Sequence, residues 1–418
     1  MWDRWARYVA IRQLRFGIAQ SLLTIGVVSI SVTLIIFIGS LIGGLQKRLI
    51  AIITGSIPNI VISQPQRLPI AAWEVPALRR EGRVYIGTRS KLQQRKLKIE
   101  DWQMWIYRLQ KFDPNVIAVS PVVEGDAILS SGESRKGVAV IGVIPERYNQ
   151  VVEIQGKLRA GHFFGLKSDE LALGYLIAQD MNLKLGDKVR LSTSEGASRT
   201  LNVAGIFETG YQLVDNSTAY VPLRTGQSLF GLGNAVTSIG IKLALIFEAD
   251  NVTRLLRRQV PYEVKSWMEE NQQLLTALRT QTQTSRLIMA FIVLASGFGI
   301  ASILITSVTS KLQEIGILRA IGATRKQIIG LFTLQSTLMA AMGAVFGVFL
   351  GVGLSIATYR LRLATSAPGR EEEVFPILLT PQLILGAMAI AIAVGFVASL
   401  YPAWRASKVS PIEVIRGA

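Results

Sequence analysis

The stretch FGIAQSLLTIGVVSISVTLIIFIGSLIGGLQ, residues Phe16–Gln46, runs for 31 residues without a charged side chain. A helix needs about 20 predominantly apolar residues to cross the roughly 30 Å hydrocarbon layer of a bilayer. Three further uncharged runs also meet this length: Leu287–Ser310, Gln327–Tyr359 and Val374–Trp404. A buried helix of a soluble core could explain one such run, but not readily four. We therefore predict a membrane α-helical fold with four transmembrane helices.

The first run could also be a cleaved signal peptide. Such peptides have an apolar region of only about 7–15 residues, followed by an A-x-A-like cleavage site. The run here is much longer and no such site follows it. We therefore expect Phe16–Gln46 to be a retained membrane anchor.

The orientation of the helices is predicted from Lys and Arg near their ends, which favour the cytoplasmic side. The N-terminal segment, the 311–326 linker and the tail together carry 11 basic and 3 acidic residues. The linker between the third and fourth helices is balanced, with three of each sign. We therefore expect both termini and the 311–326 linker in the cytoplasm, in a multi-pass protein of the cytoplasmic (inner) membrane.

This topology divides the chain into four parts. They are 1–46, with the first helix; 47–286, an extracytoplasmic domain with stalk helices at its ends; 287–404, with helices two to four and a cytoplasmic helix at 311–326; and 405–418, a cytoplasmic tail.

The 47–286 segment has the short Val- and Ile-rich runs and the helical patterns of a large α+β domain. The expected strands are Asn59–Ser63, Val138–Val143, Lys188–Ser192, Leu201–Ile206, Ala219–Pro222 and Ile239–Leu243, and the expected helices are Trp102–Leu109 and Leu171–Leu183. The basic segment 64–98 lacks periodicity, which favours an insertion or loop.

The net charge of +17 does not indicate nucleic-acid binding, because the cytoplasmic part of it is the topology signal itself. The chain has no cysteine and one histidine, His162, so neither a zinc site nor a catalytic histidine set is expected, and His162 is expected in a turn or at the surface. No G-x-x-x-x-G-K-[ST] loop occurs. If ATP is used, another chain binds it.

The predicted spans carry no Asp, Glu, Lys, Arg or His, which argues against an ion or proton pathway. Gly343, Gly347 and Gly351 form a stripe on the third span, and Gly39 and Gly43 a shorter one on the first. Such spacing lets helix backbones approach closely. We favour packing within the chain, and a seam between two copies is the alternative.

The linker KLQEIGILRAIGATRKQ (Lys311–Gln327) has apolar residues at helical spacing, and Gly322 is expected to end the helix. A short helix of this kind either lies on the membrane or docks into a groove of a partner protein. Periodicity alone does not choose between them.

Two motifs resemble the FtsX/MacB/LolC-type ABC permeases. EIGILRAIGA (Glu314–Ala323) is similar to their coupling helix, and YPAWRASKVSPIEVIR (Tyr401–Arg416) to their closing motif. The resemblance implies an ATPase-coupling helix formed by Glu314, Ile315, Gly316, Ile317, Leu318, Arg319, Ala320, Gly322 and Ala323, and a C-terminal motif with Pro402, Arg405 and Pro411.

Further segments resemble the lipoprotein-releasing LolC/LolE branch, and with them a MacB-like periplasmic domain. They include Gly55–Ile60, Leu173–Val189, Gly205–Gly210 and Asp215–Leu223. The second span departs from that branch, which usually has an asparagine where this chain reads Gly297–Ile300. The sequence of the coupling helix resembles that of MacB more than that of LolC/LolE.

The resemblance implies a permease subunit that is not itself an enzyme, binds no cofactor and pairs with a dimeric ABC ATPase carrying ATP and Mg. A second permease copy or paralogue would complete it. It would release a lipoprotein client toward a periplasmic carrier or adaptor. Phe37, Met289, Phe291 and Phe298 could contact acyl chains, although such residues commonly just face lipid.

Three alternatives remain. The first is MacB-like export of a peptide or glycolipid. The second is an FtsX-like scaffold that moves nothing and activates a cell-wall hydrolase. A membrane enzyme comes last, because no catalytic set is found.

Overall fold

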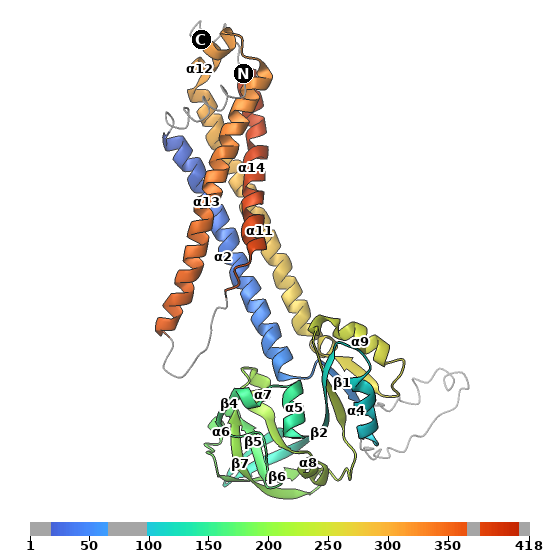
Figure 1. Cartoon of the computed structure of the whole chain (residues 1–418). Helices are drawn as coiled ribbons and strands as arrows, with labels where there is room; N and C mark the ends of the chain where they lie inside the picture. Colours follow the sequence, from blue (N-terminus) through green and yellow to red (C-terminus); the bar gives the residue numbers. More distant parts are fainter. Residues whose placement is uncertain (1–17, 66–97, 366–376, 409–418) are drawn as a thin grey trace, which may run out of the picture. The chain divides into compact units, whose positions relative to one another are not determined.

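The computed structural model describes residues 18–65, 98–365 and 377–408, without the side chains of 18 and 361–365. It divides into two compact units, shown with the chain coloured by sequence in Figure 1. The helical unit comprises residues 1–48 and 276–418, and the sheet unit comprises Leu49–Leu275.

The sheet unit is a mixed sheet with helices packed on it. In the order of their pairing, the strands are β10 (Glu263–Ser266), β1 (Ile60–Ser63), β9 (Ser238–Leu243), β2 (Val116–Ser131), β3 (Ser134–Val143), β8 (Thr218–Pro222), β5 (Glu170–Gly174), β7 (Ser198–Phe207) and β4 (Leu158–Gly161). Strand β6 (Lys188–Thr193) pairs with both β2 and β7. The β3–β8 and β5–β7 pairs are parallel and the other pairs are antiparallel. This confirms the predicted α+β class.

The double pairing of β6 closes a barrel. The ring runs β2-β3-β8-β5-β7-β6 and returns to β2, and its interior is filled by apolar residues such as Leu129, Val140, Leu171 and Val203. Strands β10, β1 and β9 continue from the first half of β2 as an open sheet, with a separate core around Ile60, Ile241 and Trp267. Strand β2 therefore joins two subdomains, each with its own core.

All six predicted strands are confirmed, as is the first predicted helix. They are β1 (Ile60–Ser63), β3 (Ser134–Val143), β6 (Lys188–Thr193), β7 (Ser198–Phe207), β8 (Thr218–Pro222), β9 (Ser238–Leu243) and α4 (Trp102–Gln110). The smaller elements between them are α5 (Pro145–Val151), η2 (Gln155–Lys157), β4 (Leu158–Gly161), α7 (Gln212–Ser217), α8 (Leu223–Leu229), η3 (Ile246–Glu248), α9 (Ala249–Leu256) and β10 (Glu263–Ser266).

The predicted helix Leu171–Leu183 is wrong over its first half. That stretch forms strand β5 (Glu170–Gly174) and then the short helix α6 (Tyr175–Asp180). Strand β5 lies between β7 and β8, and four of its five residues are buried. A strand buried on both faces reads as a continuous apolar run, which periodicity does not distinguish from a helix.

The longest described strand, β2 (Val116–Ser131), is not predicted from the sequence. Pro121 and Gly125 interrupt its pattern, and both residue types argue against a central strand. Gly125 is required here by packing, since a Cβ atom on it would lie 2.4 Å from the Phe230 ring. Tertiary contacts therefore select a residue that local propensity disfavours.

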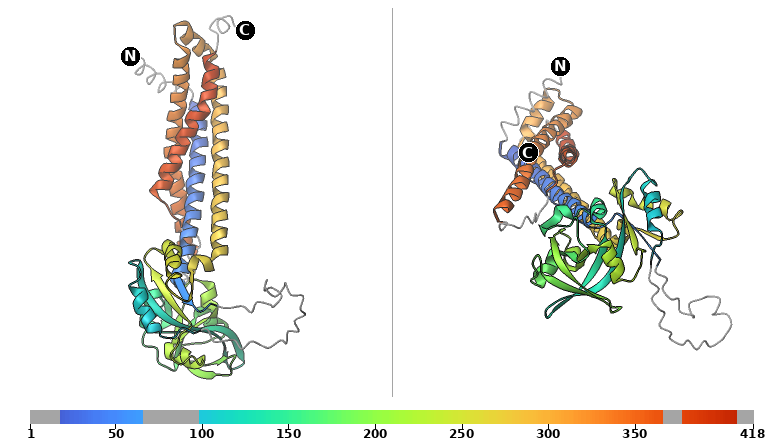
Figure 2. Two further views of the ribbon diagram at one scale, coloured as in Figure 1. Left: turned by 90° about the vertical axis from the view of Figure 1, so that its right-hand side faces the viewer. Right: turned by 60° about the horizontal axis from the view of Figure 1, so that its bottom comes forward.

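The long helices are α2 (Ile18–Ser56), α11 (Gln272–Ser310), α13 (Arg325–Thr365) and α14 (Pro381–Ser407), and they run side by side in the left view of Figure 2. They form the helical unit, except that residues 49–56 of α2 and 272–275 of α11 belong to the sheet unit. Among the described residues these are the four helices long and apolar enough to cross a membrane. The prediction of four spans is confirmed. The fourth predicted run starts at Val374, whereas its helix begins at Pro381, where the Thr380 side chain caps it by accepting a hydrogen bond from Leu383 N.

The segment before the second span, which we expect to be a helical stalk, is not one continuous helix. A short helix α10 (Trp267–Glu270) ends at Asn271, and α11 starts afresh at Gln272. The Asn271 side chain donates to the Trp267 carbonyl, 2.9 Å away, and so caps the first piece.

Several predictions fall outside the described residues. These are the N-terminal charges before Ile18, most of the 64–98 insertion, the 366–376 part of the linker between the third and fourth helices, and the closing motif beyond Lys408, including Pro411. The first two basic residues of that linker, Arg360 and Arg362, lie in α13.

Candidate functional site

Helix α12 (Leu312–Ala320) follows α11, and one of its faces packs into the helical unit. Ile315 is 2% exposed and shares a cluster with Phe332 of α13 and Ala403 of α14. Leu318 packs against the same cluster. This face of α12 is occupied by the chain's own side chains.

Arg319 and Gly322 position the end of α12. Arg319 Nη1 donates to the carbonyl oxygen of Ser407, 3.0 Å away, at the last residue of α14. Gly322 has a φ of +106°, which side chains rarely tolerate, and the helix ends just before it as predicted. The helix is thereby held at both its packed face and its end.

The opposite face of α12 points to solvent and is partly apolar. Ile317 is 55% and Ile321 81% exposed, beside the exposed Glu314 and Ala320. Exposed apolar side chains on a fixed helix are typical of a surface that docks on a partner. We call Ile317 and Ile321 the α12 outer pair.

The residues predicted for ATPase coupling are thus divided by the structure. Ile315, Gly316, Leu318 and Arg319 lie in internal contacts, whereas Glu314, Ile317 and Ala320 lie outside. Apolar residues surround α12 on every side, so spacing could not indicate which of them face a partner.

The glycine stripe of α13 lies against α2 of the same chain. A Cβ atom on Gly347 would be 2.7 Å from the Ser29 carbonyl oxygen, and one on Gly343 would be 2.8 Å from that of Ile25. Gly351 faces Ile36 in the same way, at 3.2 Å. The α2 and α13 backbones therefore touch along this seam.

The shorter stripe on α2 meets the start of α14. A Cβ atom on Gly39 would lie 2.8 Å from Leu383 Cδ1, and one on Gly43 would lie 3.8 Å from Leu378 Cδ2. The backbone of this region is also joined by a hydrogen bond from Leu378 N to the Ser40 carbonyl, 3.0 Å long.

The four residues predicted to contact lipid or client separate into two pairs. Phe291 and Phe298 of α11 are 69% and 76% exposed. Phe37 and Met289 are half-buried, and Met289 packs on the apolar core of the unit. Phe291 and Phe298 are therefore the more accessible pair.

In the closing motif, Pro402 is buried inside α14 and Arg405 is exposed near its end. Pro402 therefore serves packing, while Arg405 is available at the surface.

In the sheet unit, two lysines bind the C-terminal end of α2. Lys242 Nζ of β9 donates to the Thr54 carbonyl oxygen, 2.9 Å away, and Lys157 Nζ of η2 donates to that of Gly55, 2.8 Å away. The last carbonyl groups of a helix lack hydrogen-bond donors and carry partial negative charge. Ammonium groups there both donate hydrogen bonds and balance that charge. Burial lowers the pKa of both lysines, with Glu153 opposing it. Both ammonium groups are therefore partly desolvated where they bind the helix end.

Replacing both lysines by methionine is expected to lower the free energy of unfolding of the sheet unit by about 1–3 kcal/mol, because two buried carbonyls lose charged donors. Thermal unfolding of the full chain, followed by tryptophan fluorescence, measures this. Lys188→Met on the exposed part of β6 is the matched control and should change nothing. Equal unfolding of the double variant and the control would show that the lysines do not hold α2.

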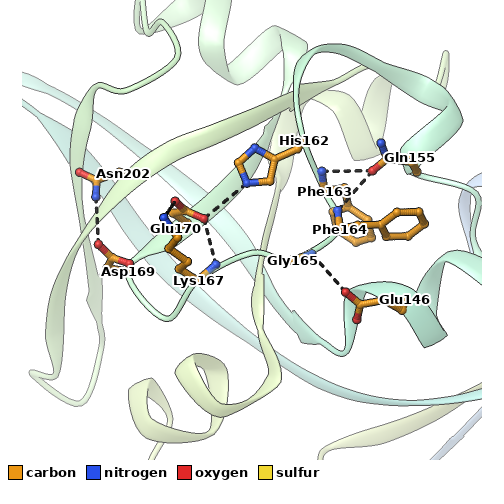
Figure 3. A network of polar contacts seen from close by, with 10 residues as sticks. All are labelled: Glu146, Gln155, His162, Phe163, Phe164, Gly165, Lys167, Asp169, Glu170 and Asn202. Carbon is orange, nitrogen blue, oxygen red and sulfur yellow. Dashed lines mark hydrogen bonds and ion pairs between the residues drawn. The ribbon is translucent and has the colours of Figure 1, made fainter.

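The single histidine lies in a loop fixed by hydrogen bonds (Figure 3). Gln155 Oε1 accepts from the Phe163 and Phe164 amides, both at 3.2 Å, and His162 Nε2 lies 3.5 Å from Glu170 Oε2. The His162 side chain is 52% exposed, which confirms its predicted surface position. Within the described ranges, no three His, Cys, Asp or Glu side chains gather as a metal site.

Family models match both units of the chain. Residues 21–259 match the MacB-like periplasmic core domain, and residues 286–411 match the C-terminal region of FtsX-like permeases.

Characterised relatives include the lipoprotein-releasing system transmembrane protein LolC of Xylella fastidiosa, 28% identical over 341 residues, which are 76% of this chain and 82% of the relative. Another is the macrolide export ATP-binding/permease protein MacB 1/2 of Paracoccus denitrificans, 26% identical over 72% of this chain and 45% of the relative. Among solved structures, the periplasmic region of MacB from Actinobacillus actinomycetemcomitans aligns with a TM-score of 0.31 and 17% identity, over 56% of this chain and 94% of that one.

Proposed function

Because the chain belongs to the FtsX-like ABC transporter permeases that carry a MacB-like periplasmic core domain, we propose that a separate dimeric ATPase drives it to release lipoproteins from the cytoplasmic membrane. The chain itself binds no nucleotide in this proposal. ATP and Mg belong to the ATPase.

The α12 outer pair is the observation that supports the proposed coupling to an ATPase. Ile317 and Ile321 are exposed on a helix whose other face is anchored to α13 and α14. A partner that binds this pair and moves would carry α12 with it, and through the Arg319–Ser407 contact also the end of α14. The docking residues of this proposal are therefore Ile317 and Ile321, with Glu314 beside them.

The orientation follows from charge. Basic residues gather in the N-terminal segment, the α12 linker and the tail, which favours the cytoplasm for all three. The sheet unit then lies on the periplasmic side. Because Lys157 and Lys242 of this unit bind the end of α2, a shift of that helix would reach the domain that handles the client.

Release of lipoproteins is supported by the relatives named as lipoprotein-releasing proteins, such as LolC of Neisseria meningitidis, 27% identical over 340 residues. A lipoprotein client offers acyl chains, and the exposed rings of Phe291 and Phe298 are suited to contact them. A second copy or a paralogue of the chain would provide the opposite wall.

A second candidate is export of an amphiphilic peptide or glycolipid. The match to MacB 1/2 over 322 residues favours it, because that relative is named for macrolide export. The motions would be the same and only the client would differ.

Depleting the chain from its own cell distinguishes the two. Release predicts that triacylated lipoproteins accumulate in the cytoplasmic membrane, as measured by fractionation and mass spectrometry. Restoring the full chain should reverse the accumulation. Unchanged lipoprotein distribution together with sensitivity to amphiphilic compounds would overturn release and support export.

A further inference from the structure

Three helices of the helical unit turn polar side chains toward one small cavity. Its polar lining comes from Gln20, Ser21 and Thr24 of α2, Ser307 of α11, Lys311, and Gln335 of α13. The cavity volume is about 10 Å³. The helices that provide this lining are apolar on average over their length.

Gln335 is the side chain that needs a partner. It is 3% exposed, and its Oε1 accepts no hydrogen bond from any described group of the chain. A buried acceptor left without a donor costs about 1–3 kcal/mol. Thr24 cannot supply the donor, since its hydroxyl already donates to the Gln20 carbonyl of its own helix, 3.0 Å away.

The cavity size selects the ligand. A volume of about 10–15 Å³ holds one water molecule, which needs two to four polar partners. An acyl chain or a headgroup phosphate is too large, and a metal cation would be repelled by the Lys311 ammonium at the same cavity. We propose that this cavity binds one ordered water molecule, which donates to Gln335 Oε1 and bridges α2, α11 and α13.

The position of this water has a mechanical consequence. Lys311 is also the residue that precedes the first turn of α12, so the bridge lies where α12 joins α11. The glycine seam between α2 and α13 brings the two backbones into direct contact. A bridging water can exchange partners when the helices shift, so no buried group is left unpaired. The N-terminal end of α2 can therefore shift against α11 and α13 at a lower free-energy cost than the middle of the helix.

Met339 allows a direct test, because it lines the same cavity and is only 3% exposed. Hydroxyl radicals made by brief X-ray radiolysis of a bound water oxidise the nearest sulfur, even when it is buried. For the full chain in nanodiscs, we expect Met339 to form sulfoxide several times faster than Met388, which is less buried but packs on the apolar core. Tryptic mass spectrometry measures both rates in one sample.

Gln335→Leu should reduce the Met339 rate to that of Met388. Thr333→Val is the control on the same helix, because Thr333 bonds only within α13, and it should leave the rate unchanged. Equal rates for Met339 and Met388 in the unaltered chain would overturn the proposal, whether or not the leucine variant folds. An undiminished Met339 rate in a folded Gln335→Leu chain would overturn it as well.

Discussion

Ile317→Asp is expected to weaken binding of the partner ATPase by about 30-fold or more. Ile317 is 55% exposed on α12, so the new carboxylate is solvated in the free chain and the fold is not strained. In the complex the same carboxylate would lose its water at the centre of an apolar contact. A charge placed at such a centre weakens binding by about 2 kcal/mol or more. Co-purification of the ATPase with the tagged full chain from its own membranes measures the loss.

Ile317→Leu is the matched control, because it keeps an apolar side chain of the same volume, and it should retain the ATPase. Leu318→Asp is a poorer probe, since Leu318 packs against the cluster of Ile315 and Phe332 and a charge there disturbs the helical unit itself. Wild-type recovery of the ATPase with Ile317→Asp would remove α12 from the docking surface.

Gly347→Ala is expected to destabilise the helical unit by about 1–3 kcal/mol. The added methyl group would lie 2.7 Å from both the Ser29 carbonyl oxygen and Val32 Cβ, so the backbones of α2 and α13 must separate. Separation also lengthens the hydrogen bond from Thr33 Oγ1 to the Gly347 carbonyl, now 3.1 Å. The usual gain of helix propensity from alanine, about 1 kcal/mol, is smaller than this strain.

Gly353→Ala on the same helix is the control, because a Cβ atom there has no neighbour within 4 Å. It should be neutral or slightly stabilising. The chain contains no cysteine, so Ser40→Cys places a single thiol in the helical unit, where Ser40 is fully buried. Heating with a thiol-reactive dye then reports unfolding of this unit alone. Equal transitions for both glycine variants would show that the seam is not tightly packed.

Local patterns sufficed for much of the candidate site. Gly322 indicated the end of α12 because only glycine readily adopts its φ of +106°, and the stripe Gly343–Gly351 indicated a close helix contact. The same patterns did not reveal the lysines that bind the end of α2. Lys157 and Lys242 lie about 100 and 190 residues from that helix end, and nothing in their own surroundings marks them.

Patterns along the chain were enough to predict the four membrane spans, the α+β class of the sheet unit and most of its strands. Each of these features depends on the apolarity or alternation of residues that are neighbours along the chain. Long-range packing, by contrast, makes β2 a single strand shared by a barrel and an open sheet, and makes β5 a strand rather than a helix. It also decided that Ile317 and Ile321, rather than Ile315 and Leu318, face outward. A helix that is apolar on all sides can bury any of its faces, and the choice is made by the helices it packs against.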